Sequence, residues 1–217
     1  MKRTIFTLLT LVIITGLVFT GCDTAETDLE EASTLQVQMR VAPDADQANQ
    51  TSAVILEEVK LFVEELELDG TNGTSDFELE DFIVILPVDG SPRVLIETVV
   101  PAGLYDEFEF EIEAPGDDDE INDPDLRDET GSYSLVAKGT YDGDEFRFRT
   151  DEDIEVEFDL SPPLEISEGD NTTLIISVDV ASWFIGPGGD ELDPNDPDNE
   201  ETIVGNIKNS IQVEYND

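Results

Sequence analysis

Strict alternation of apolar and acidic residues is the feature that most limits how this chain folds. Residues 108–113 read Phe-Glu-Phe-Glu-Ile-Glu, and shorter stretches of the same kind recur along the sequence. Successive side chains of a β-strand point to opposite faces, so such a segment has one apolar face and one acidic face. The pattern predicts sheets whose apolar faces pack together and whose carboxylates face solvent.

The net charge leaves two alternatives, a disordered chain or a folded domain adapted to high salt. Residues 22–217 contain 8 basic and 54 acidic residues, a formal charge of −46. Such a charge favours disorder when apolar residues are few, but here they make up 39% of the chain and alternate with the acids. We therefore expect a folded domain from a halophilic bacterium, because molar salt shortens the Debye length to about 3 Å and screens the repulsion. The same charge argues against a nucleic-acid partner, which requires a basic surface.

Short alternating segments separated by turn residues predict an all-β fold, a single β-sandwich. Turns are expected at 89–92, at 101–103 and at 142–143, where Asp-Gly is typical of a tight hairpin. Eight such strands suit a sandwich of two sheets. The predicted strands are 35–41, 82–88, 93–100, 105–113, 133–141, 144–149, 153–160 and 172–180.

Two further segments complete the predicted secondary structure, one ambiguous and one helical. Residues 53–68 fit both a helix and a strand, and a strand with a β-bulge at Glu64-Glu65 is favoured because the alternation changes phase there. Near the end, Asn199 is followed by Ile203, Ile207 and Ile211 at four-residue steps. This spacing predicts one short capped C-terminal helix whose apolar side docks on the sandwich.

The start of the chain has the pattern of a lipoprotein signal peptide. Lys2 and Arg3 precede an apolar run too short to span a membrane, and Cys22 follows three residues, Phe-Thr-Gly, that resemble a bacterial lipobox. Cys22 is the only cysteine, so an internal disulfide is excluded. The sequence predicts a signal peptide over 1–21 and acylation of Cys22.

The region after Cys22 sets the predicted domain boundaries. Residues 22–33 are acidic and aperiodic, which is typical of a flexible tether, and residues 34–217 then form the β-sandwich domain. The acyl chains would hold the protein in the cell envelope. Acidic residues soon after the cysteine resemble export tags of surface lipoproteins, so the outer membrane or cell surface is favoured over the inner membrane.

Four segments carry a resemblance to a known family. They are 35–38 (Leu-Gln-Val-Gln), 58–61 (Glu-Val-Lys-Leu), 100–105 (Val-Pro-Ala-Gly-Leu-Tyr) and 174–180. Together they resemble the bacterial lipoproteins of unknown function whose domain is named DUF4382, over most of residues 34–215. The resemblance implies a transthyretin-like or immunoglobulin-like sandwich and supplies no known activity.

The side-chain chemistry argues against an enzyme. The chain has no histidine, which removes the usual general base and the usual zinc ligand. A carboxylate pair that cleaves carbohydrate stays open as the alternative, since acids are abundant. Trp183 and Phe184 are expected to fill the end of the sandwich more readily than to stack on a sugar. We expect a non-enzymatic binding or structural module of the envelope, with a protein or glycan ligand.

One loop is a candidate cation site. Oxygen ligands are crowded into residues 190–198, and calcium takes six to eight oxygens. The candidate ligands are Asp190, Asp193, Asn195, Asp196 and Asp198. A solvated acidic linker is the competing interpretation. Residues 117–125 are a weaker candidate because their adjacent acids favour a disordered insert. They belong to the longer acidic stretch 117–129, hereafter the acidic insert. No other cofactor is expected.

Overall fold

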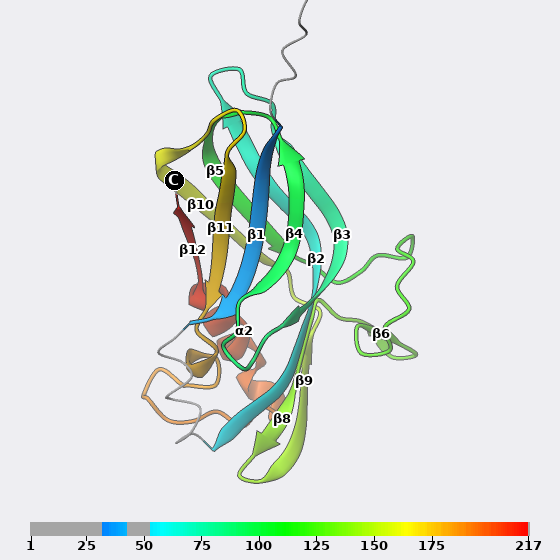
Figure 1. Ribbon diagram of the computed structural model, residues 1–217. Helices are drawn as coiled ribbons and strands as arrows, with labels where there is room; N and C mark the ends of the chain where they lie inside the picture. The colour runs from blue at the N-terminus through cyan, green and yellow to red at the C-terminus, as the bar shows by residue number, and fades with distance from the viewer. Residues whose placement is uncertain (1–31, 43–52, 217) are drawn as a thin grey trace, which may run out of the picture.

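The alternating segments form strands in two packed sheets. The computed structural model describes residues 32–42 and 53–216 (Figure 1). The elements of the first half are β1 (Ser33–Val41), β2 (Val54–Thr71), β3 (Phe77–Leu86), β4 (Arg93–Val100), β5 (Gly103–Ile112), β6 (Arg127–Asp128) and β7 (Gly131–Ser132). Those of the second half are β8 (Leu135–Tyr141), β9 (Asp144–Thr150), β10 (Ile154–Ile166), β11 (Asn171–Val178), the 3₁₀ turns η1 (Val180–Ser182) and η2 (Pro197–Asn199), α2 (Glu200–Ser210) and β12 (Ile211–Asn216).

The two sheets differ in size and in how far they extend. The smaller has the order β12-β11-β1-β4, in which β1 and β11 are parallel and the other neighbours are antiparallel. The larger has the order β10-β5-β2-β8-β9, with β3 also paired to β2. Figure 1 shows the smaller sheet packed against the upper part of the larger one, with α2 at the lower end. The predicted all-β sandwich with one C-terminal helix is confirmed.

Strand β2 organises the larger sheet because both of its long edges are paired. One edge pairs with β3, while the other pairs with β8 along its first half and with β5 along its second half. The register with β5 shifts between Val63 and Glu65, which confirms the predicted bulge. The bulge keeps Val63 and Leu66 both pointing into the core although they are three residues apart.

The core lies between the inner faces of the sheets and continues under the lower end. Phe108, Phe110 and Ile112, from the segment with the strictest alternation, are fully buried. At the lower end Phe184 packs edge-on against Phe146 and Phe148 of β9, and the neighbouring Trp183 is equally buried. Both aromatic residues therefore serve packing, as the sequence favoured.

The C-terminal helix forms as expected but ends earlier and begins differently. Ile203 and Ile207 are buried, whereas Ile211 already opens β12. The predicted cap is wrong, because the Asn199 side chain does not cap α2 and instead donates a hydrogen bond to the carbonyl oxygen of Asp193 at 3.1 Å. The sequence also missed β12, which pairs with β11 and extends the smaller sheet.

The hairpin expected at 142–143 is confirmed. Tyr141 pairs with Asp144, which leaves two residues in the turn. Asp142 and Gly143 have φ angles of 51° and 88°, and two positive values are what the tight turn between twisted strands requires. The turn places β9 beside β8, where its side chains reach the acidic insert.

Several predictions fall on residues outside the described ranges. They are the signal peptide over 1–21, the lipid attachment at Cys22 and nearly all of the tether over 22–33. Within the described ranges, the single α-helix is too short to cross a bilayer.

Candidate functional site

The outward face of the larger sheet carries two regions of opposite character. The first, here called the carboxylate ladder, consists of outward carboxylates on and beside β2, β3, β5 and β10. Its members are Glu64, Glu65, Glu67, Asp69, Glu78, Glu80, Glu107, Glu109, Glu111, Glu113, Glu155, Glu157 and Asp159. The second, here called the basic clamp, lies where β8 and β9 replace β5 beside β2. Its cations are Lys60, Lys138, Arg147 and Arg149.

Strand register sets the carboxylates of the ladder directly opposite one another. Glu67 of β2 pairs with Glu109 of β5, and Glu109 pairs in turn with Glu157 of β10. On the other edge of β2, Glu67 faces Glu78 of β3. Neighbouring strands lie about 4.8 Å apart, and like charges directly opposite each other are destabilising. The ladder is therefore a flat face of repelling charges.

This crowding raises the pKa of several carboxyl groups. A hydrogen bond with Glu113, together with burial and neighbouring charges, raises the pKa of Glu64 to about 7. Burial and the charge of Asp69 raise the pKa of Glu67 to about 7. Burial and adjacent carboxylates also raise the pKa of Glu111. Part of the ladder is consequently protonated near neutral pH.

Two groups of three carboxylates are close enough to share a cation. Both groups lie in the described part of the chain, and in each the carboxylate oxygens come within 4.8 Å of one another. None of these residues was predicted from the sequence to be a cation ligand. The groups are Glu64, Glu111 and Glu113, and Glu67, Asp69 and Asp76. Their members come from separate strands or from the two sides of a turn. Only the pairing register reveals them.

The carboxylates of the predicted calcium loop are not among these closely spaced groups. Asp193 accepts a hydrogen bond from the backbone N–H of Asn195 at 2.9 Å, and Asp196 accepts one from Asp198 at 3.0 Å. These contacts form the turns that lead into α2, and Asn195, Asp196 and Asp198 are exposed. Calcium binding by residues 190–198 stays a prediction.

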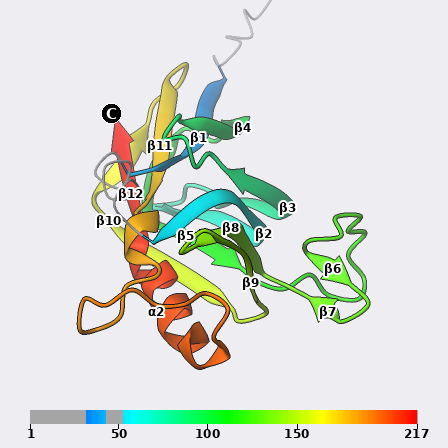
Figure 2. The same cartoon turned by 90° about the horizontal axis from the view of Figure 1, so that it is seen from below.

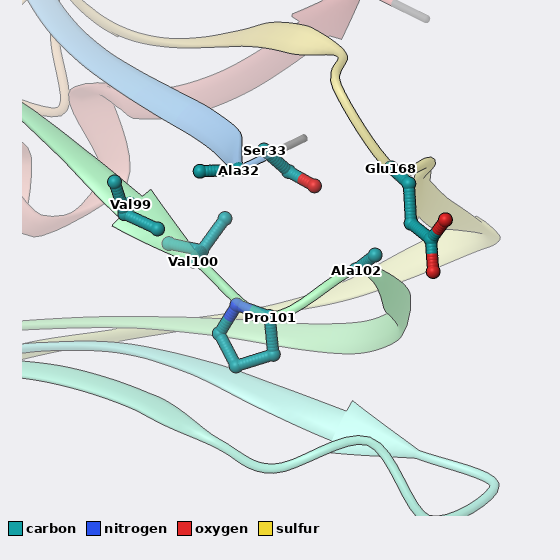
Figure 3. A pocket seen from close by; sticks show the side chains of 7 residues that line it. All are labelled: Ala32, Ser33, Val99, Val100, Pro101, Ala102 and Glu168. Carbon is teal, nitrogen blue, oxygen red and sulfur yellow. The ribbon is translucent and has the colours of Figure 1, made fainter. Parts of the chain in front are cut away.

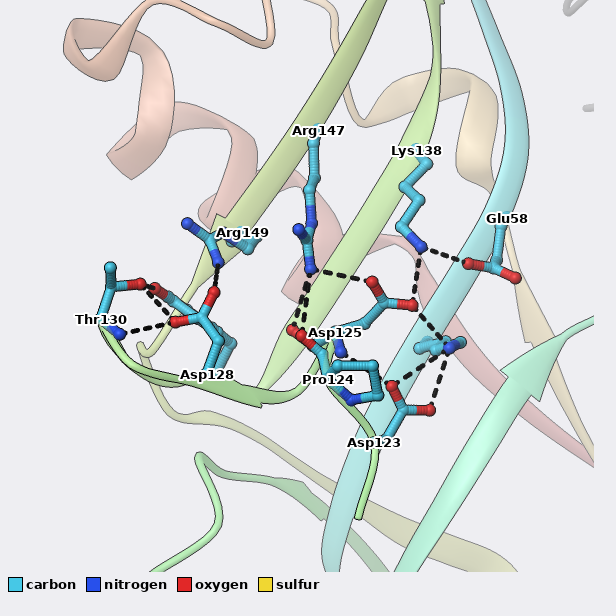
Figure 4. A network of polar contacts seen from close by, with 11 residues as sticks. Glu58, Asp123, Pro124, Asp125, Asp128, Thr130, Lys138, Arg147 and Arg149 are labelled. Atoms are coloured by element: carbon cyan, nitrogen blue, oxygen red, sulfur yellow. Dashed lines mark hydrogen bonds and ion pairs between the residues drawn. The ribbon is translucent and has the colours of Figure 1, made fainter. Parts of the chain in front are cut away.

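The basic clamp holds the acidic insert against the sheet (Figure 4). Lys60 Nζ lies 2.9 Å from Asp123 Oδ2 and 2.6 Å from Asp125 Oδ2. Lys138 Nζ reaches the same Asp125 oxygen at 2.6 Å and Glu58 at 2.8 Å. Two lysines therefore share one carboxylate of the insert.

Two arginines of β9 complete the clamp. Arg147 Nη2 lies 2.8 Å from the second oxygen of Asp125, and Arg149 Nη1 lies 2.7 Å from Asp128 Oδ2. Burial alone would raise the pKa of Asp125, but hydrogen bonds from Lys138 and Lys60 lower it to about 2. Asp125 is thus ionised throughout the physiological range, in contrast to the ladder.

Apolar contacts, and hydrogen bonds from a side chain to backbone carbonyl oxygens, also hold the acidic insert in place. Leu126 of the insert packs on Phe62 and Val136 in a small second core on the outward side of the sheet. Arg127 donates to the carbonyl oxygens of Asp119 and Pro115 at 2.8 Å each. The expectation of a disordered insert is wrong, because the sheet supplies cations and apolar side chains that a linear sequence does not show. Figure 2 shows β6 of the insert, and β7 just after it, to one side of β2, β8 and β9.

A hollow of about 460 Å³ opens at the end of the sandwich where β1 begins (Figure 3). Small and apolar residues line it, and Glu168 is its single ionisable group. The lining residues are Ala32, Ser33, Val99, Val100, Pro101, Ala102 and Glu168. One carboxylate without a second titrating partner does not make an acid–base site.

Comparison with protein-family models, with curated proteins and with solved structures found no match. The site must therefore be interpreted from its own chemistry. That chemistry consists of a polyanionic sheet face and a paired basic clamp.

Proposed function

We propose that this chain is a lipid-anchored, non-enzymatic binding or structural module in the envelope of a halophilic bacterium. The observation that carries the proposal is the carboxylate ladder. A face of registered like charges opposes folding in dilute salt, and features that oppose folding concentrate at functional surfaces. The ladder follows the outward face of a β-sheet, which suits contact with an extended partner more than turnover of a small enclosed substrate.

The source environment follows from the same face. At about 1 M salt the Debye length is about 3 Å, shorter than the spacing of neighbouring strands, so repulsion between rows is largely screened. A protein that works in molar salt tolerates this pattern. The charge also favours a protein or glycan partner over a nucleic acid.

The anchor would set which end of the domain faces the membrane. Ala32, the first described residue, lies ten positions after Cys22, and an extended chain spans at most about 3.6 Å per residue. The domain would therefore stand within about 36 Å of the acyl chains. Strand β1 begins at the end of the sandwich opposite α2 (Figure 1). The basic clamp and α2 would point away from the membrane, which suits an outer-membrane or surface protein.

The anchor is tested by changing its acceptor. The Cys22→Ser variant is expected to lose acylation and to remain in the aqueous phase on detergent partitioning, or to persist as an uncleaved precursor. Thr24→Ser, two residues further along, is the matched control and should partition like the wild type. An acylated mass for the Cys22→Ser protein would refute the anchor.

One observation favours the alternative of a carbohydrate-processing enzyme. Glu64 and Glu113 are hydrogen-bonded carboxyl groups, and the pKa of Glu64 is raised to about 7, which suits donation of a proton at neutral pH. Turnover of polysaccharides by the purified domain, lost in Glu64→Gln and retained in Glu129→Gln, would establish this alternative and refute the non-enzymatic module.

A further inference from the structure

A second hollow, of about 260 Å³, lies between β9, the link from β7 to β8 and the segment that leads into α2. Three segments distant in sequence meet there. The polar and aromatic groups that line it are Tyr133, Arg147, Phe148, Arg149, Asn195, Asp196 and Glu200. Its size is just below the range of about 300–1,000 Å³ that is typical of small-molecule sites.

The charges of the side chains that line this hollow balance, whereas those of the ladder are all negative. Arg147 and Arg149 contribute two positive charges, and Asp196 and Glu200 contribute two negative charges. Guanidinium groups only donate hydrogen bonds, carboxylates only accept them, and the Asn195 amide does both. An anionic ligand would meet the two carboxylates, and a cationic ligand would meet the two arginines. A neutral ligand with many hydroxyl groups satisfies both kinds of group at once.

The arginines are held in place before any ligand binds. Arg149 stacks on the Tyr133 ring, 4.1 Å from its centroid, and pairs with Asp128. Arg147 is fixed by Asp125. Each arginine uses a single terminal nitrogen in its ion pair, Nη1 of Arg149 and Nη2 of Arg147, and a guanidinium has five N–H groups. Donors therefore remain for a ligand, and little side-chain entropy is lost on binding.

We propose that this hollow binds one sugar unit of a neutral glycan. The proposal deepens the proposed function and rests on it, since it names the ligand class of a non-enzymatic module. Vicinal hydroxyl groups of the sugar donate to the carboxylates of Asp196 and Glu200 and accept from the arginines. These contacts act at hydrogen-bond distance, so molar salt weakens them less than it weakens long-range attraction.

The experiment uses calorimetry on the full mature chain in about 1 M KCl, where counterion attraction is screened. The neutral probes are cello-, manno- and N-acetylchito-oligosaccharides. Oligogalacturonate is the anionic probe, and deacetylated chito-oligosaccharide is the cationic one. At least one neutral probe is expected to bind, with the charged probes binding about tenfold more weakly.

Variants connect the binding to this hollow. Asn195→Ala with Glu200→Ala should weaken binding at least about tenfold, equivalent to about 1.4 kcal/mol. Glu201→Ala removes the same charge from the same helical turn but outside the hollow, and should bind like the wild type. Equal melting temperatures of the two variants exclude a folding defect.

The other outcomes separate this inference from the proposed function. Binding of no neutral probe, preference for a charged probe, or unchanged binding in the double variant would each overturn the glycan site. Chromatography of the same mixtures reports turnover. Cleaved glycan would instead overturn the non-enzymatic module, whereas intact glycan without binding overturns the glycan site alone.

Discussion

The carboxylate ladder and the basic clamp lie on the same face of one sheet, and β2 contributes to both. Its first half carries Lys60, paired twice with the acidic insert, and its second half carries Glu67, which faces carboxylates on both neighbouring strands. The bulge at Glu64 separates the two halves. One strand thus presents a neutralised surface and a repelling one.

The difference shows where the chain uses its few cations. The clamp uses four of only 10 basic residues, and all four pair with carboxylates of the acidic insert. In the ladder, by contrast, carboxylates face carboxylates across the strands, so screening by dissolved salt should stabilise this region. The two regions should therefore respond oppositely to salt and to pH.

The largest expected effect is that of salt on the whole domain. Raising KCl from about 0.1 M to about 1 M shortens the Debye length from about 10 Å to about 3 Å. We expect the melting temperature to rise by about 10 °C, which corresponds to about 3 kcal/mol for a domain of this size. Thermal unfolding followed by circular dichroism measures it, and a flat profile would contradict the halophilic origin.

A matched pair of triple variants assigns this salt effect to the ladder. Neutralising its middle row should flatten the salt dependence more than neutralising three exposed acids elsewhere. The ladder variant carries Glu67→Gln, Glu109→Gln and Glu157→Gln. The control carries Asp118→Asn, Glu129→Gln and Glu168→Gln. Equal flattening would mean that net charge alone matters and that register does not.

The second largest expected effect is the loss of stability when the basic clamp loses its shared carboxylate. Asp125→Ala leaves Lys60 and Lys138 partly buried and without their shared carboxylate, and should destabilise the domain by about 2 kcal/mol, between the values for exposed and buried pairs. Urea unfolding measures the loss. Asp118→Ala, an exposed acid of the same insert, should cost less than about 0.5 kcal/mol. Equal losses would mean that the clamp contributes nothing specific.

The smallest effect separates the two regions by pH. The pKa of Glu67 is raised from 4.5 to about 7, so the folded state keeps a proton that the unfolded state releases. The contribution of this proton to the stability of the folded state is fully present below about pH 4.5 and is lost as the pH rises through about 7. We expect Glu67→Gln to gain about 1 kcal/mol at pH near 8. It should also reduce the fall in stability between about pH 5 and 8.

The clamp should respond at the acid end instead. The pKa of Asp125 is lowered from 3.8 to about 2, so its contribution is present above 3.8 and is lost as pH falls through about 2. Asp125→Ala should flatten the acid limb of the stability profile and leave the limb near pH 7 unchanged. A change in both limbs would show that the regions are coupled.

The local sequence pattern was enough to predict most of the strands. The alternation in 108–113 predicted β5 and its buried side, because the period of a strand is a property of the backbone. The bulge at Glu64 and the hairpin at Asp142 were equally local signals. By contrast, β12 follows directly on α2 and was missed, since its pairing with β11 is a long-range contact. The group formed by Glu64, Glu111 and Glu113 was missed for the same reason.

The sequence by itself determined the all-β class, the acidic outer surface and the faces that pack, because backbone period and burial follow from neighbouring residues. Only the tertiary structure decided which carboxylates oppose carboxylates and which oppose cations. Pairing register and the docking of the insert bring Lys60 to Asp125 across 65 positions, and Coulomb energy depends on distance in space. A uniformly acidic sequence thus becomes a folded domain in which one face of a sheet carries a region of opposed carboxylates beside a region of paired charges.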